Sequence, residues 1–221
     1  EYLTAILYMT PYKVMVDGKL FNSCSMAAMA SCIEGCLYTA GRGRMNTVQS
    51  ARQRKAEWFY RDRVGFMKQL YHDIQKFSNY CKKRGIQPCV RLNGTTDIRW
   101  ELIPAMPHNK MNIFQEFPEV QFYDYTKIPN RKVADYPNYH LTWSYSAANP
   151  KYEELFWDVI RKGMSVAVVF RKPINMTTWR GYKVVDGDKD DLRFLDPQSS
   201  IVALYAKGAA KHDSTGFVQD I

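Results

Sequence analysis

The sequence predicts a single-domain α/β fold in which parallel strands and helices form a barrel-like layer. Short runs rich in Val, Ile, Tyr and Phe recur along the chain, and several are apolar without interruption, as parallel strands buried on both faces are. Segments with helical spacing lie between them, which favours strand–helix alternation. Hydrophobic residues make up 46 % of the 221 residues, so a core of good size is expected and a disordered chain is excluded.

The first long helical pattern covers residues 46–85, where apolar positions recur every three or four residues. Asn46 is expected to cap its start, Asp62 and Gly65 to divide it into two helices, and Gly85 to end it. A second helix is expected over 151–163 and a short one within 111–119. The predicted strands are Leu3–Met9, Cys89–Gly94, Val120–Lys127, Tyr139–Ser146, Ser165–Phe170, Tyr182–Asp188 and Ile201–Lys207.

One domain is expected over residues 1–221, because no linker, repeat or low-complexity tract interrupts the chain. No apolar run reaches the length of a membrane span, and the first residues lack the features of a secretory signal, so no membrane partner is expected. The predicted parts are a cysteine loop (22–46), a basic helical segment (46–85), barrel strands and helices (88–207) and a C-terminal tail (208–221).

The positive charge is concentrated in one segment. The chain has 31 Lys and Arg against 22 Asp and Glu, and residues 42–91 hold thirteen of the former and three of the latter. The rest of the chain is therefore nearly neutral. The segment is interpreted either as a solvated helical face or as a surface that binds nucleic acid or another polyanion. The candidate anion-binding residues are Arg42, Arg44, Arg52 and Arg54, close to the Gly-Arg-Gly sequence at 41–43.

Three of the five cysteines, Cys24, Cys32 and Cys36, lie in one loop after the first predicted strand. Three thiolates could ligate three irons of a [4Fe–4S] cluster and leave the fourth iron open. One alternative is that the three cysteines bind zinc or take part in redox chemistry. The other is that they are small buried residues with a purely structural role. Cys81 and Cys89 fall on apolar positions and are expected in the core.

Polar residues follow several predicted strands at their ends, where parallel α/β folds build their sites. The candidate catalytic residues are Asp124, Lys127, Ser144 and Lys207. The structural alternative for Asp124 and Lys127 is an ion pair on the barrel rim, and that for Ser144 is a strand hydroxyl bonded to the backbone. The acidic run at 186–191 suits a divalent cation or, more simply, a solvated turn.

Five segments resemble the bacteriophage gene product 88 family. They are CLYTAGRG (36–43), RLNGTTDIRWE (91–101), FYDYTK (122–127), VVDGDKDDLRFLDP (184–197) and AKGAAKHDSTGFV (206–218). The resemblance covers nearly the whole chain and implies a phage protein that acts in the host cytoplasm. The family itself carries little firm functional assignment.

A weaker resemblance is to the radical S-adenosylmethionine enzymes, which place a three-cysteine loop after their first strand. It implies a partial (β/α)6 barrel, a [4Fe–4S] cluster on Cys24, Cys32 and Cys36, and S-adenosylmethionine on the open iron. By position it implies that Asn93, Thr95 and Asp97 orient this cofactor. The cysteine spacing, C-x7-C-x3-C, departs from the C-x3-C-x2-C of those enzymes, and no aromatic residue precedes the last cysteine.

The expected function is therefore that of a phage iron–sulfur protein, radical-SAM-like, acting on a nucleotide, nucleic acid or other anionic substrate. One alternative is a nucleic-acid-binding or nuclease-like protein. Another is a non-enzymatic factor with a structural zinc that modulates a host protein. The sequence has no Ser-His-Asp order, no phosphate-binding loop and no Rossmann glycine pattern. A serine hydrolase, a nucleotide triphosphatase and a nicotinamide-dependent enzyme are therefore disfavoured.

Overall fold

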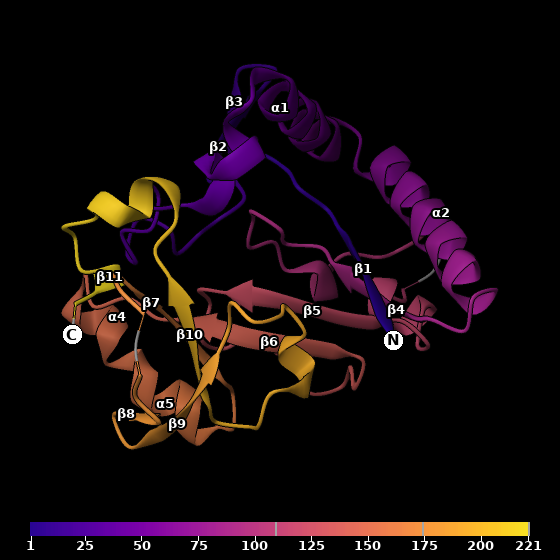
Figure 1. Cartoon of the computed structure of the whole chain (residues 1–221). Coiled ribbons are helices and arrows are strands. Elements are labelled where there is room, and N and C mark those ends of the chain that lie inside the picture. The colour runs from indigo at the N-terminus through magenta and orange to yellow at the C-terminus, as the bar shows by residue number, and fades with distance from the viewer. Residues whose placement is uncertain (109, 174, 221) are drawn as a thin grey trace. The chain divides into compact units, whose positions relative to one another are not determined.

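The computed structural model of the chain describes residues 1–108, 110–173 and 175–220, and it shows a mixed α/β fold (Figure 1). The elements group into two compact units, and the chain passes from one to the other several times. Unit 1 comprises residues 1–23, 49–124 and 131–140, and unit 2 comprises residues 24–48, 125–130 and 141–221.

Unit 1 is built on parallel strands. Strand β1 (Tyr2–Ile6) pairs with β4 (Gln87–Arg91), and β4 pairs with β5 (Gln121–Thr126). An antiparallel hairpin joins β2 (Lys13–Val16) to β3 (Lys19–Asn22) through Asp17 and Gly18, whose positive φ angles suit a two-residue turn. Two short helices, η3 (Trp100–Leu102) and α3 (Ile113–Glu116), lie between β4 and β5.

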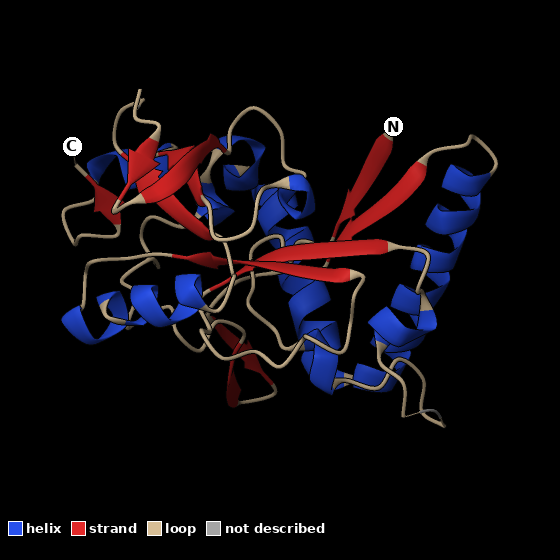
Figure 2. Ribbon diagram, turned by 90° about the horizontal axis from the view of Figure 1, so that it is seen from below, coloured by secondary structure: helices blue, strands red, loops and turns tan. Residues whose placement is uncertain are grey.

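The long basic segment forms two helices, α1 (Asn46–Arg61) and α2 (Arg63–Lys82), which confirms the predicted division. The Asp62 side chain caps α2 by accepting a hydrogen bond from the Gly65 backbone N–H at 2.9 Å. Phe66, Met67 and Leu70 are among the buried residues of α2, which packs on β4 and lies beside it in Figure 2. Cys81 and Cys89 are fully buried, as expected of core residues.

Unit 2 also contains parallel strands, formed by β6 (Tyr139–Ser144), β7 (Val166–Phe170), β10 (Ile201–Tyr205) and β9 (Tyr182–Asp186) in this order. Strand β8 (Thr178–Trp179) forms a hairpin with β9, and β11 (Val218–Gln219) pairs with β7. Its helices are α4 (Pro150–Glu153), α5 (Leu155–Arg161), η1 (Leu37–Thr39), η2 (Gly41–Arg44), η4 (Arg193–Leu195) and η5 (Gly208–His212).

The predicted strands and helices are confirmed at the level of single elements, with bounds that differ by a few residues. The predicted partial (β/α)6 barrel is wrong. The hydrogen-bonded order of the nine-stranded sheet is β1-β4-β5-β6-β7-β10-β9-β8, with β11 on β7, so no strand closes the sheet back onto β1 in the part of the chain that is described.

The physical reason for the open sheet lies in the connections. In a β/α barrel a crossover helix follows each parallel strand. Here α1 and α2 precede β4, and α4 and α5 precede β7, but β9 reaches β10 through a loop and the 3-10 helix η4. The antiparallel strand β8 then pairs with β9 and occupies the edge of the sheet. A barrel of parallel strands would continue with another parallel strand at this edge.

Among the described residues, no helix combines the length and the apolar character that a membrane span requires.

Candidate functional site

The predicted metal ligands Cys24, Cys32 and Cys36 lie in unit 2 and are all half-buried. Cys32 Sγ donates a weak hydrogen bond to the Ala27 carbonyl at 3.8 Å and packs near the buried Phe217. Within residues 1–108, 110–173 and 175–220, no three His, Cys, Asp or Glu side chains are grouped so that they could hold a metal ion.

The loop is instead packed against the C-terminal segment of the same unit. Gly35 lies so close to the Phe217 ring that a Cβ there would approach it to 2.9 Å, and Gly208 lies against Ala40. Glycine at position 35, where the radical-SAM pattern has an aromatic residue, thus allows a close approach of the loop backbone.

Asp124, a predicted catalytic residue, lies near the end of β5 in unit 1 and is 1 % exposed. Its Oδ1 accepts a hydrogen bond from the Asn93 backbone N–H at 2.9 Å, and its Oδ2 accepts one from the Tyr139 hydroxyl at 3.2 Å. Burial raises the pKa of Asp124 to about 6, although Arg91, the Asn93 N–H, Arg131 and Tyr139 oppose the rise. The Asp124 carboxyl group therefore holds its proton to a higher pH than an exposed aspartate does.

Arg131 connects this carboxyl group to two more. Its Nε and Nη2 donate to the two carboxylate oxygens of Glu101 at 3.0 and 2.5 Å, its Nη1 lies 3.5 Å from an Asp97 oxygen, and Nη2 also donates to the Tyr139 hydroxyl. Burial lowers the pKa of Arg131, but Tyr139, Glu101 and Asp97 outweigh it and hold that pKa above its ordinary value. We call Asp97, Glu101, Asp124, Arg131 and Tyr139 the charge network.

The predicted cofactor-binding residues lie beside this network. The Asn93 Oδ1 accepts hydrogen bonds from the Thr96 hydroxyl, the Ile98 N–H and the Trp100 indole. The Thr95 hydroxyl donates to the Met9 carbonyl at 2.5 Å. Asn93, Asp97 and Asp124 are thus brought together at the ends of β4 and β5. Their side chains are at least nine-tenths buried, and the partners named here are groups of the protein itself.

Sequence reasoning missed Glu101, Arg131 and Tyr139. A Glu in a polar loop and an Arg after a strand are ordinarily surface residues, and no local pattern distinguishes these two. Arg131 and Glu101 are 30 positions apart in the sequence, so only the fold reveals the pair.

The remaining predicted catalytic residues lie in unit 2. The Lys127 ammonium group donates to the Ser144 and Tyr145 carbonyls at 3.1 and 3.3 Å and lies 4.5 Å from the Phe217 ring centroid. Ser144 contributes its backbone carbonyl to this contact. Lys207 is exposed and forms an ion pair with Asp188.

The predicted anion-binding residues differ in exposure. Arg42 and Arg44 are exposed on η2, and Arg54 is exposed on α1. Arg52 is only 8 % exposed, and its guanidinium carbon lies 4.8 Å from the Tyr8 ring centroid. Arg52 is therefore turned into unit 1 rather than toward a ligand in solvent.

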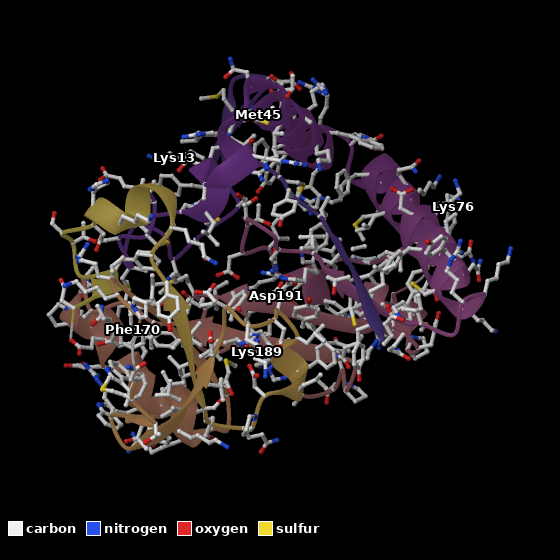
Figure 3. All side chains as sticks on the ribbon, viewed as in Figure 1. Lys13, Met45, Lys76, Phe170, Lys189 and Asp191 are labelled. Atoms are coloured by element: carbon white, nitrogen blue, oxygen red, sulfur yellow. The ribbon has the colours of Figure 1, made fainter. Side chains whose placement is uncertain are left out.

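A row of exposed basic residues lies on α2 and its C-cap. Lys68, His72, Lys76 and Lys83 follow one another at four- and seven-residue spacing, which places them along one side of the helix. All four are exposed, and Lys76 lies on the outward side of α2 in Figure 3. With the adjacent exposed Lys82 we call them the basic stripe. In the described part of the chain no carboxylate forms an ion pair with these lysines.

The family model described as Gene product 88 matches the chain over residues 1–221. The chain belongs to this family of bacteriophage proteins. Neither the curated proteins nor the solved structures contain a match. The resemblance to the gene product 88 family is therefore confirmed, whereas the comparisons give no support to a link with the radical S-adenosylmethionine enzymes.

Proposed function

We propose that this gene product 88 protein binds nucleic acid through the basic stripe on α2. The observation that carries the proposal is the set of four exposed lysines, with no carboxylate paired to them among the described residues. Phosphate groups are the partners that such a row attracts, because each neutralised phosphate releases condensed counterions.

The dimensions of the stripe suit an extended polyanion. Lys68 and Lys83 are 15 residues apart, which corresponds to about 22 Å along a helix. The neighbouring acidic residue, Asp73, accepts a hydrogen bond from Gln69 at 2.8 Å and so has a neutral local partner. The competing interpretation is that this side of α2 is only solvated. In that case Lys82 and Lys83 complement the negative C-terminal end of the helix dipole and bind no ligand.

The test is the salt dependence of binding to a fluorescently labelled oligonucleotide. The full chain is compared with the triple variant Lys68→Gln/Lys76→Gln/Lys83→Gln. The matched control is Lys151→Gln/Lys183→Gln/Lys189→Gln, which removes three exposed lysines of unit 2. Loss of three phosphate contacts should reduce the slope of log affinity against log salt by about 2 to 3. Equal binding by the two variants, or binding that salt does not weaken, would refute the proposal.

The iron–sulfur function stays a prediction, and so does the binding of S-adenosylmethionine. Its support is the presence of three cysteines within thirteen residues. Iron, sulfide and zinc analysis of protein purified without oxygen, repeated with Cys24, Cys32 and Cys36 each changed to Ala, would decide between a cluster, a structural zinc and no metal. Action in the host cytoplasm and modulation of a host protein likewise remain predictions.

A further inference from the structure

We infer that the nucleic acid bound by the basic stripe is single-stranded, and that one of its bases stacks on the Tyr80–Arg84 pair. This inference rests on the proposed function. Tyr80 is 46 % exposed on α2, and the Arg84 guanidinium carbon lies 3.7 Å from its ring centroid.

Tyr80 is not among the buried core residues of unit 1. Other aromatic residues of these helices pack on rings: Tyr71 lies 4.8 Å from Phe117, and Tyr60 stacks on Phe21 at 4.5 Å. For Tyr80, the ring contact among the described residues is with Arg84, and its hydroxyl has no hydrogen-bond partner there. A large, half-exposed aromatic side chain whose ring contact is an exposed guanidinium group offers a surface to a ligand that is itself flat and apolar on its faces.

The position of the pair connects it to the stripe. Tyr80 follows Lys76 by four residues and precedes Lys83, the C-cap of α2, by three, so the three positions share one side of the helix. A single strand that places phosphates on Lys76 and Lys83 would bring an unstacked base to the ring. Aromatic rings and guanidinium planes both take stacked bases.

A duplex cannot use this arrangement in the same way. Its bases are stacked on each other, and it presents phosphates to a surface helix. The lysines alone would serve a duplex, whereas an exposed tyrosine–arginine pair within a lysine row adds affinity only for bases that are free to leave the stack.

The experiment measures fluorescence anisotropy of a labelled oligothymidylate and of a duplex of equal length, with the full chain. Tyr80→Leu keeps apolar bulk on the helix but removes the ring. The control is Trp157→Leu, another exposed aromatic residue (42 %), which lies in unit 2. We expect Tyr80→Leu to weaken single-strand binding about tenfold, Tyr80→Phe to restore it, and Trp157→Leu to leave it unchanged. The salt slope of Tyr80→Leu should equal that of the unmodified chain, because no phosphate contact is lost.

The outcomes separate the two proposals. If Tyr80→Leu and Trp157→Leu bind the single strand equally well, or if the duplex binds as tightly as the single strand, the stacking inference is overturned while the stripe still binds phosphates. If neither nucleic acid binds, both proposals fail. Circular dichroism melting of each variant shows whether a loss of binding reflects a loss of fold.

Discussion

The charge network and the basic stripe lie in the same unit and both contain charged side chains, but in opposite surroundings. In the network, Arg131 has a fully buried side chain between Glu101 and Asp97. In the stripe, lysines extend into water without ion pairs among the described residues. A buried charge needs a partner because its removal from water costs free energy. An exposed charge stays hydrated without a partner, so it can still bind a ligand of opposite charge. The charges of the network are therefore satisfied inside unit 1, and the stripe is the surface proposed to bind.

The largest expected effect comes from removing the central cation of the network. Arg131→Met should lower the free energy of unfolding by about 3–5 kcal/mol, because it leaves buried carboxylates without a counter-charge. Urea unfolding measures the loss. The control is Arg161→Met, which breaks an exposed pair with Asp158 and should cost no more than about 1 kcal/mol. Similar losses in the two variants would mean that the buried and the exposed ion pairs contribute equally to the free energy of unfolding.

The next effect is a pH dependence carried by Asp124. Its pKa is raised to about 6 in the folded protein by burial, from an ordinary value of about 4. Between these pH values the folded state binds more protons than the unfolded chain, so the stability contributed by this group falls as pH rises from about 4 to 6. The full difference is about 3 kcal/mol.

Asp124→Asn should remove that contribution, because the amide does not titrate. The measurement is the unfolding free energy of both proteins from pH 4 to 8, and the quantity compared is their difference. We expect the difference to shift in favour of the variant as pH rises through the window. A difference that stays constant with pH would show that Asp124 keeps an ordinary pKa in the folded state.

A smaller effect on stability is expected at the junction between α1 and α2. Asp62→Ala removes the cap of α2 and should cost about 1 kcal/mol of stability, measured by thermal unfolding. Asp73→Ala removes another exposed aspartate of the same helix region, whose hydrogen bond is to the Gln69 side chain, and should change stability by less than about 0.5 kcal/mol. Equal effects would argue that the division between α1 and α2 does not depend on the cap.

The smallest effect on stability is expected in the stripe itself. Lys76→Gln should change the unfolding free energy by less than about 0.5 kcal/mol, since the side chain is exposed and forms no ion pair among the described residues. The same variant should reduce the salt slope of nucleic-acid binding by somewhat less than 1. A large loss of stability would place Lys76 in the structural framework and remove it from the proposed surface.

The elements could be predicted from sequence, because each follows from a local pattern. Apolar spacing marks α1 and α2, Asp62 and Gly65 mark their division, and β-branched and aromatic runs mark most of the parallel strands. The short strands β2, β3, β8 and β11 were not predicted, since two to four residues carry too little pattern. Barrel closure was predicted wrongly, because the order of strands along the chain does not specify whether the last one returns to the first.

The sequence by itself determined the location of the charge and the membership of the chain in its family. The +10 excess of residues 42–91 is a matter of composition, and the long motifs are local. Only the tertiary structure decided which charges are buried. It turned Arg52 inward over Tyr8, and it joined Asn93 to Asp124 across 31 positions. The burial of a residue depends on what packs against it from elsewhere in the chain. The tendency to form a helix or a strand follows largely from local sequence, and net charge follows from composition.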